Sequence, residues 1–288
     1  MPVKSPLREV TNGQWKIAGS PLRRVFLTLG REKCPFRCVY CFARFSQYEG
    51  VSSLEEAENG STHFGKADII YPACDVDLFA TADPIDHLWR AARLGGSISV
   101  STKARIRESI LGELKSVAEY LDEQHRCMKI GISISAKLNG LAIEGGAAGY
   151  EARLRNLDLL QNAGLSSSLV LRPILNEVSD DEYGVILEEA ATRTSRVLLG
   201  EEYLDAEPLL RRELQDDLIV ATRNVSWLPD IPSWPVASCP DRLLGLSDCA
   251  ERLGYRVFQS DSDLMSDLLS ARDDKELAAV RHYGEPHV

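Results

Sequence analysis

The sequence predicts an α/β protein in which parallel strands form a partial barrel of six β/α units, followed by a C-terminal capping segment. Short β-rich apolar runs alternate with amphipathic stretches at helical spacing, and the strand runs suit burial on both faces. A cysteine-rich loop directly follows the first expected strand, at the strand end where barrels of this kind carry their chemistry. An open doubly wound sheet is the alternative, although no Gly-x-Gly-x-x-Gly run follows a strand.

Strands and helices are expected to alternate between residues 24 and 200. The expected strands are residues 24–30, 68–73, 97–101, 129–134, 168–172 and 196–200. The expected helices are residues 84–94, 108–124, 150–163, which Gly164 closes, and 180–192. Residues 51–66 are expected as a short helix or an exposed loop.

Changes in composition divide the chain into three parts. Residues 1–22 are polar and interrupted by Pro and Gly, which predicts an extended N-terminal arm. Residues 23–200 form the expected barrel. Residues 201–288 begin differently, with a Trp- and Pro-rich passage at 227–235, and then resemble a helix at 243–253 and a strand at 255–258. We expect this last part to cap the barrel.

Length and composition limit the class of protein. A chain of 288 residues, of which 44 % are hydrophobic and 26 % charged, can bury one large core. It has no apolar run long enough to span a membrane and no N-terminal stretch of signal-peptide type, so we expect a cytoplasmic protein without a membrane partner. Seven cysteines, an odd number, argue against a disulfide framework.

Charge is distributed unevenly along the chain. The net charge is −10, but residues 1–50 carry nine Lys and Arg against three Asp and Glu, whereas residues 201–288 carry nine against eighteen. The basic N-terminal part could meet a phosphate or carboxylate group. The chain as a whole lacks the strongly basic surface of a general nucleic-acid binder.

Three cysteines form the most informative motif. Cys34, Cys38 and Cys41 have the spacing C-x3-C-x2-C. A four-iron cluster needs four ligands, so three thiolates would leave one iron open to a substrate or cofactor. A structural zinc site is the alternative, but it needs four ligands, usually in two pairs, and only the distant His63 and Cys74 could complete it. A redox or coincidental cysteine trio also remains open.

This motif, with Tyr40 before its last cysteine, resembles the signature of the radical S-adenosylmethionine (SAM) enzymes. The resemblance implies a 4Fe-4S cluster and SAM as cofactors. It also implies an activity in which one electron cleaves SAM to methionine and a 5′-deoxyadenosyl radical, which then takes hydrogen from a substrate. A reductant protein such as flavodoxin or ferredoxin would supply the electron.

Within that superfamily, residues 25–180 are similar to the spore photoproduct lyase group of DNA repair enzymes. The matching stretches are the cysteine loop, residues 73–75 with 85–88, residues 101–103, and residues 133–135 with Glu144 and the helix at 150–154. The similarity implies a pyrimidine photoproduct in DNA as substrate. A nucleoside or another small molecule is the alternative, and a zinc-binding module that uses Trp227 and Trp234 for recognition is a hypothesis of another class.

The resemblance also implies roles for single residues. Cys74 would return a hydrogen atom to the product radical, although a free cysteine is more often a small buried apolar residue. Asp75, with Asp77 as a competitor, would hold the SAM ammonium group, unless it is a turn carboxylate. The other residues that the resemblance places at the SAM site are Tyr40, Lys103, Ser133, Ser135, Glu144 and Arg172.

One position departs from the pattern of the spore photoproduct lyase group. That group has Tyr-Cys-Tyr at the third cysteine, where the tyrosines relay a hydrogen atom, and this chain has Tyr40-Cys41-Phe42. Phenylalanine has no O–H bond to give. We therefore expect any relay to be rerouted, with Tyr71 as the candidate.

Overall fold

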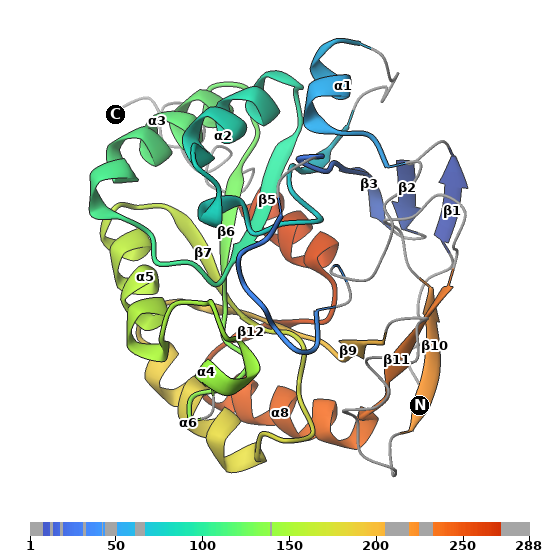
Figure 1. Ribbon diagram of the computed structural model, residues 1–288, viewed down its shortest axis with the longest axis vertical. Helices are drawn as coiled ribbons and strands as arrows, with labels where there is room; N and C mark the ends of the chain where they lie inside the picture. Colours follow the sequence, from blue (N-terminus) through green and yellow to red (C-terminus); the bar gives the residue numbers. More distant parts are fainter. Residues whose placement is uncertain are drawn as a thin grey trace, which may run out of the picture.

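The structure is a computed structural model that describes residues 8–11, 14–17, 20–30, 33–41, 43, 51–60, 67–138, 140–204, 219–224 and 233–271. Within these ranges the main sheet has nine strands, of which seven run parallel and curl into a half-barrel (Figure 1). The parallel strands, in sheet order, are β3 (Ser20–Phe26), β4 (Ile69–Tyr71), β5 (Ser97–Thr102), β6 (Met128–Ser133), β7 (Ser166–Leu171), β8 (Arg196–Leu199) and β12 (Arg256–Phe258). The predicted α/β partial barrel is confirmed.

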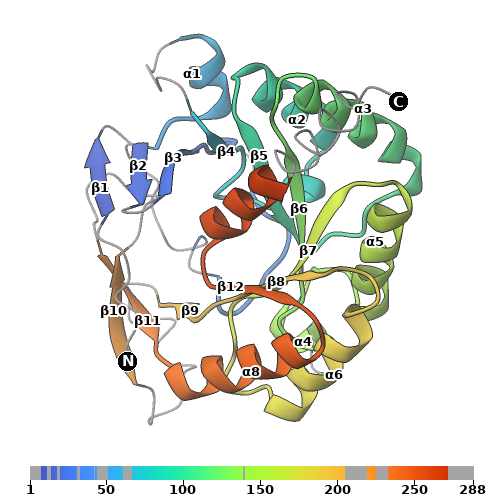
Figure 2. The ribbon, with the colours of Figure 1, turned by 180° about the vertical axis from the view of Figure 1, so that it is seen from behind.

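Helices follow the strands and cover the outer face of the half-barrel (Figures 1 and 2). The α-helices are α1 (Leu54–Glu58), α2 (Pro84–Arg93), α3 (Leu111–Asp122), α4 (Gly140–Ile143), α5 (Tyr150–Asn162), α6 (Asp180–Ala190) and α8 (Pro240–Arg252). Two short 3-10 turns, η2 (Leu78–Ala80) and η3 (Glu108–Ile110), lie in the connections.

Several helices begin or end at the positions expected from the sequence, and capping residues account for these boundaries. Asp83 accepts a hydrogen bond from the Asp86 amide and is followed by Pro84, which begins α2. Ser179 caps α6 in the same way, and Gly164, with φ of +71°, follows the end of α5. Within the stretch expected as a short helix or a loop, α1 begins after a capping box between Ser53 and Glu56.

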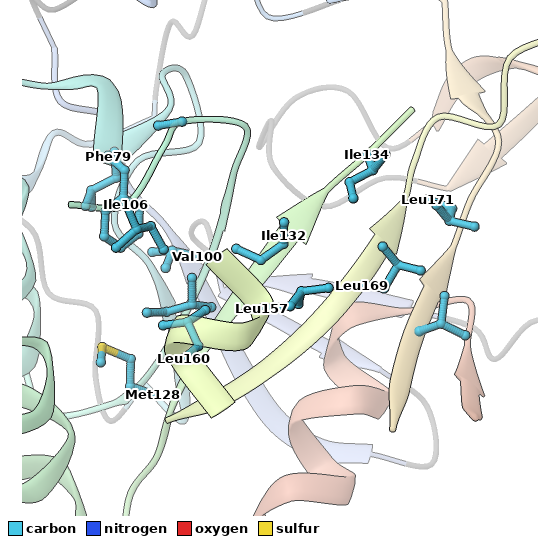
Figure 3. Close-up of a cluster of buried hydrophobic side chains, with 14 of the residues drawn as sticks. Phe79, Val100, Ile106, Met128, Ile132, Ile134, Leu157, Leu160, Leu169 and Leu171 are labelled. Atoms are coloured by element: carbon cyan, nitrogen blue, oxygen red, sulfur yellow. The ribbon is translucent and has the colours of Figure 1, made fainter. Parts of the chain in front are cut away.

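The main core lies between the strands and the outer helices. Alternate residues of β6 and β7, such as Ile132 and Leu169, point toward Leu157 and Leu160 of α5 (Figure 3). Each of these four side chains is fully buried. Burying a Leu or Ile side chain is worth about 1.5 to 3 kcal/mol, so this layer supplies much of the stability.

The inner, concave face of the same strands carries polar residues such as Ser99 and Lys129 as well as apolar ones, and residues 261–271 cover part of it. Residues 261–271 form a helical segment on this side of the sheet (Figure 2). Its Leu264, Met265 and Leu268 pack against inward-facing residues that include Val170 and Leu198. The segment therefore covers part of the concave face.

Two regions differ from the expected outline. The region expected as an N-terminal arm contributes β1 (Arg8–Thr11) and β2 (Gln14–Ile17), which extend the sheet antiparallel to β3. The expected boundary at residue 200 does not mark the end of the sheet. β12 pairs in parallel with β8 after the α8 crossover, so it adds a seventh parallel strand.

The remaining C-terminal elements form a small antiparallel sheet beside the barrel. Its strands are β9 (Glu202–Tyr203), β10 (Val220–Asn224) and β11 (Ser233–Ala237). Trp234 is only 4 % exposed and packs with Tyr203 and Val236, so it is a core residue and not a recognition surface. Trp227 lies outside the described residues, as do His63 and Phe42. Among the helices that the structure describes, none has the length and apolarity to cross a membrane.

Candidate active site

The cysteine loop begins after β3 at the carboxyl ends of the parallel strands, as predicted. Exposed and buried residues alternate along it. Cys34 is partly buried and Phe36, Cys38 and Tyr40 are buried, whereas the residues between them are exposed. The Cys41 amide donates to the Cys38 carbonyl over 3.2 Å, so the last part of the loop forms a tight turn. The three motif cysteines face one cavity from this loop.

The connection between β6 and α5 holds the cysteine loop from one side. The Val39 amide donates to the Ile143 carbonyl over 2.9 Å, and Cys38 forms a β-bridge with Glu144. Gly146 allows the two segments to approach closely, since a Cβ atom there would lie 2.8 Å from the Pro35 carbonyl oxygen. The loop conformation therefore depends on a segment about one hundred residues further along the chain.

A cavity of about 560 Å³ lies between the cysteine loop and the inner face of the half-barrel. It is large enough for a small-molecule cofactor. Most of the predicted site residues line it, and these are Cys34, Cys38, Cys41, Tyr40, Tyr71, Cys74, Asp75, Lys103, Ser133 and Arg172. Ser135 and Glu144 do not line the cavity but lie behind Tyr40.

Tyr40 belongs to a buried polar network. Its hydroxyl donates to Glu144 Oε1, and Ser135 Oγ lies 2.9 Å from the same hydroxyl oxygen. Glu144 also forms an ion pair with Arg153 of α5, with Oε2 and Nη1 2.6 Å apart and both side chains almost fully buried. Burial, and then the negative charge of Glu144, raise the pKa of Tyr40 well above its ordinary value. The tyrosine is therefore held as a neutral hydrogen-bond donor.

Lys103 connects this network to the cavity. Its Nζ donates to Ser133 Oγ over 2.8 Å, lies 4.0 Å from Glu144 Oε1 and is 5.5 Å from the centre of the Tyr40 ring. Two residues predicted to line a SAM site, Lys103 and Ser133, are thus in direct contact. Arg153 Nη1 donates to the Ser133 carbonyl over 2.9 Å, which fixes the end of β6.

Asp77 and Asp75, the two competitors for one role, have different surroundings. The Asp77 carboxylate accepts hydrogen bonds from the Lys103 amide at 2.6 Å, the Thr102 hydroxyl at 2.8 Å and the Phe79 amide at 3.1 Å. These hydrogen bonds tie the connection after β4 to the end of β5, and Asp77 also lines the cavity. Asp75 Oδ1 accepts from the Leu29 amide over 3.0 Å, and the residue lines the cavity.

Cys74 is tied to the base of the cysteine loop. Its amide donates to the Leu27 carbonyl over 2.9 Å, which places its partly buried side chain at the cavity wall. Burial, and then the negative charge of Asp75, raise the pKa of the Cys74 thiol far above its ordinary value. The thiol is therefore protonated at neutral pH and carries an S–H hydrogen.

Arg172 lies at the end of β7 on the opposite wall. Its guanidinium group stacks on the Tyr203 ring, 4.6 Å from the ring centre, and donates to the Tyr203 hydroxyl. Gly200 makes room for the arginine, since a Cβ atom at that position would lie 2.8 Å from Arg172 Cδ. The structure thus presents an oriented cation to the cavity.

A second charged cluster forms the floor of the cavity. Asp261, from the C-terminal helical segment, pairs with the fully buried Lys129 and accepts a hydrogen bond from Ser99 over 2.6 Å. Burial opposes ionisation of Asp261, but Lys129 and Ser99 together hold its pKa below the ordinary value. Tyr71 stacks on Phe26 beside this cluster, with ring centres 4.4 Å apart.

The donor set fits an iron–sulfur cluster better than a single metal ion. Among the residues that the structure describes, no three His, Cys, Asp or Glu side chains are grouped as ligands of one ion. In a cluster each thiolate binds a different iron, so the sulfur atoms need not share one coordination sphere. The three cysteines of one loop, all facing one cavity, meet that need. Burial raises the pKa of Cys38 to about 11, while Lys103 acts in the opposite direction.

Solved structures provide the comparison with known proteins. A cysteine-to-serine variant of spore photoproduct lyase has a TM-score of 0.57 and 16 % identity, over 83 % of this chain and 76 % of that chain. The enzyme complexed with dinucleoside spore photoproduct has a TM-score of 0.56 and 15 % identity, over 79 % and 74 %. A double variant with bound AdoMet and the same photoproduct has a TM-score of 0.53 and 15 % identity, over 83 % and 76 %.

The chain has a radical SAM fold. No protein-family model matches it, and no curated protein sequence matches it either. At identities this low, the radical SAM fold is what the comparison establishes, and the chemistry of the site has to be argued from its own residues.

Sequence reasoning missed several residues of the site. Arg153 was recognisable in principle, because it lies four residues before Leu157 and therefore on the apolar face of α5. A cation on a buried face indicates a partner, which is Glu144. No local signal marks Asp261 or Tyr203, since their contacts are with distant segments.

Proposed function

We propose that the chain is a radical SAM enzyme. When bound, a 4Fe-4S cluster on Cys34, Cys38 and Cys41 together with SAM would supply a 5′-deoxyadenosyl radical, which takes a hydrogen atom from the substrate. The observation that carries the proposal is the placement of all three motif cysteines on one wall of a cavity whose other walls carry a carboxylate, an ammonium group and a guanidinium group. These groups are Asp75, Lys103 and Arg172.

The walls offer partners to the charged groups of SAM's methionine part. Asp75 is suited to the ammonium group of its methionine part, and Arg172 or Lys103 to the carboxylate. Tyr40 borders the cavity beside the cysteine loop, where we place the adenine, and Ser133 lines the same wall. Ser135 and Glu144 act indirectly in this proposal, because they hold the Tyr40 hydroxyl.

Cys74 is proposed to complete the reaction. Its thiol is protonated, so it can give a hydrogen atom to a carbon-centred product radical. The S–H bond breaks, a C–H bond forms, and the unpaired electron remains on sulfur. Tyr71, which also lines the cavity, would restore the thiol by giving its O–H hydrogen atom. The unpaired electron would then lie on the Tyr71 oxygen, which would recover its hydrogen atom from 5′-deoxyadenosine and so re-form the 5′-deoxyadenosyl radical.

The substrate proposed first is a pyrimidine photoproduct of DNA. It is suggested by the fold similarity to a spore photoproduct lyase that is complexed with a dinucleoside photoproduct. The alternative is a nucleoside or other small molecule, which is favoured by the carboxylates of Glu201 and Asp263 at the cavity and by the net charge of −10. Binding of ultraviolet-damaged and undamaged oligonucleotides separates the two, because only the first proposal requires preference for the lesion.

Anaerobic reconstitution with iron and sulfide tests the enzyme proposal. Reduction with dithionite in the presence of SAM should give 5′-deoxyadenosine, measured by chromatography. Cys38→Ala should lose both the brown colour and the product while keeping the circular dichroism of a folded protein. Cys249→Ala, on α8 outside the cavity, is the matched control and should keep both. A colourless wild-type protein that holds one zinc ion would reject the proposal.

Cys74→Ala separates a hydrogen donor from a fourth cluster ligand. The variant should keep its iron content and its formation of 5′-deoxyadenosine, and it should lose only the normal product once a substrate is found. Loss of iron on this substitution would instead make Cys74 a ligand and leave no open coordination site.

A further inference from the structure

The inner end of the cavity is bordered by apolar side chains from both arms of the curled sheet (Figure 1). On one arm, the rings of Phe26 and Tyr71 stack 4.4 Å apart and almost parallel, since the two residues are paired between β3 and β4. On the other arm, Val170 of β7 is paired with Leu198 of β8, and both line the same cavity. We call the space between these four side chains the inner pocket. Apolar walls on two sides suit a flat ring.

Asp261, the first residue of the helical segment 261–271, adds a carboxylate to this pocket. Its Oδ1 is paired with Nζ of Lys129, and its Oδ2 accepts a hydrogen bond from the Ser99 hydroxyl over 2.6 Å. The Lys129 side chain is fully buried, whereas the Asp261 side chain is 14 % exposed and lines the cavity. Lys129 and Ser99 therefore hold the carboxylate from behind. A carboxylate offers about four acceptor sites, so it can still accept a hydrogen bond from a ligand.

Ser260 supplies a complementary group beside Asp261. Its hydroxyl oxygen is buried and makes no hydrogen bond with any residue that the structure describes, although the residue lines the cavity. A buried hydroxyl without a partner is unfavourable, so a ligand that bonds to it gains affinity. Two consecutive residues thus present an acceptor, Asp261, and an available donor, Ser260. The matching ligand has an N–H group and a carbonyl group next to each other.

The charged groups at the inner pocket balance one another. Arg24 and Lys129 are cations, and Asp261 and Asp263 are carboxylates, so the net charge of these four residues is zero. An uncharged ligand leaves this balance intact, whereas an ammonium or phosphate group would add a charge to a partly buried site. The pocket therefore favours a neutral ligand.

We propose that the inner pocket binds a single flat, uncharged ring with an N–H group and a carbonyl group side by side, as in the base of a free nucleoside, and that Asp261 selects this ring. The ring N–H donates to Asp261, the ring carbonyl accepts from the Ser260 hydroxyl, and the apolar side chains contact the ring. The inference rests on the proposed function, because SAM would fill the cavity beside the cysteine loop and leave the inner pocket for the substrate.

A free nucleoside fits these surroundings better than a lesion in a DNA strand. A strand carries a phosphate on each side of a base, and the cavity already holds the carboxylates of Glu201 and Asp263. A free nucleoside brings no phosphate into the cavity. Of the two proposed substrates, the inner pocket therefore favours the small molecule.

Binding of nucleosides to the unreduced protein, measured by NMR titration, tests the inference without turnover. Thymidine and inosine are the probes, because each has an N–H group beside a carbonyl group, and N3-methylthymidine and N1-methylinosine lack that N–H group. At least one of the two nucleosides should bind, and its methylated form should bind at least about tenfold more weakly. The dinucleotide thymidylyl-thymidine should bind more weakly than the better of the two nucleosides.

Asp261→Asn should weaken binding of that nucleoside at least about tenfold and leave binding of its methylated form unchanged. Because this variant leaves Lys129 without its carboxylate, the double variant Lys129→Gln with Asp261→Asn provides an uncharged version of the pair and should show the same loss. Asp267→Asn is the matched control, since Asp267 lies on the same helical segment, is paired with Arg196 and does not line the cavity. It should bind like the wild type.

The outcomes separate this inference from the proposed function. If reduction with dithionite and SAM gives no 5′-deoxyadenosine while nucleoside binding depends on Asp261, the enzyme proposal has failed and the pocket remains. No binding of either nucleoside, equal binding of the methylated forms, or an equal loss in Asp267→Asn would each overturn the inference. Tighter binding of thymidylyl-thymidine would also overturn it and would favour DNA as the substrate.

Discussion

The two faces of strands β5, β6 and β7 differ in composition although they share one backbone. The outer face presents apolar side chains such as Val100, Ile132 and Leu169, which the helices cover (Figure 3). The inner face presents Lys129 and small residues such as Ser99 and Gly131, and it borders the cavity or its floor. The outer face specifies the fold, whereas the inner face leaves room for ligands.

The largest expected effect is that of Glu144→Gln, in the buried polar network that holds Tyr40. The change would leave Arg153 as a buried cation without its carboxylate, which should lower the free energy of unfolding by about 3 to 5 kcal/mol. Because Glu144 also holds Tyr40, we expect lower iron content and less 5′-deoxyadenosine per folded molecule. Glu151→Gln, exposed in the first turn of α5, is the control and should change none of these three quantities. Denaturant titration, iron analysis and chromatography measure them.

Leu157→Ala tests the outer face. The side chain is fully buried, so its truncation should lower the free energy of unfolding by about 2 to 5 kcal/mol. Formation of 5′-deoxyadenosine per folded molecule should stay unchanged, because Leu157 contacts the core and not the cavity. If activity fell in parallel with Glu144→Gln at equal stability, the two faces would not be functionally separate.

Glu202, the first residue of β9, tests how the burial of a carboxylate changes the pH dependence of stability. It is 4 % exposed and has no ion pair within the described residues, and burial, followed by the charge of Glu177, raises its pKa from 4.5 to about 8. The stability contributed by the protonated form is complete below pH 4.5 and is lost as the pH rises through 8. Glu202→Gln should remove this loss, which we expect to be roughly 2 to 4 kcal/mol across that window. Thermal unfolding at several pH values measures it, and equal slopes for wild type and variant would contradict it.

Gly131→Ala tests the tight packing of the inner face. The new Cβ atom would lie 2.7 Å from Val170 Cγ2 and 2.8 Å from Ser101 Oγ, so we expect a loss of about 1 to 3 kcal/mol. Gly184→Ala, in α6, is the control. Nothing lies within 4 Å of its Cβ position, and the substitution should stabilise the helix by up to about 1 kcal/mol. Destabilisation by both changes would point to a general intolerance of alanine.

The sequence was sufficient to predict the helices and strands that form the outer face. It was less sufficient to predict how the remaining elements pair. Helices such as α5 and α6 and the strands between them follow from apolar periodicity and from local stop signals such as Gly164. β12 could be recognised as a strand but not placed, because its pairing with β8 depends on packing across the α8 crossover. Periodicity reports which residues are buried and not which strand lies beside which.

For the candidate site, the local motif was informative and the distant partners were not. The cysteine spacing indicated one loop, and the structure shows that Cys34, Cys38 and Cys41 face one cavity. The contacts of Glu144 with Tyr40 and Lys103 join residues that are 104 and 41 positions apart. No spacing rule reaches such pairs, and the roles given to the individual residues remain predictions that the proposed variants test.

Residues 261–271 cover the inner face only late in synthesis, because they follow the strands of the half-barrel in the sequence. Lys129 and Ser99 leave the ribosome long before Asp261, which lies 132 and 162 residues further along the chain. During that interval the concave side of the nascent half-barrel has no helical segment 261–271 to cover it. Ser99 and Lys129 tolerate contact with water, but Val170 and Leu198 on the same side stay exposed until Leu264 and Met265 cover them. We therefore expect this late segment to remove an apolar surface that would favour aggregation of the unfinished protein.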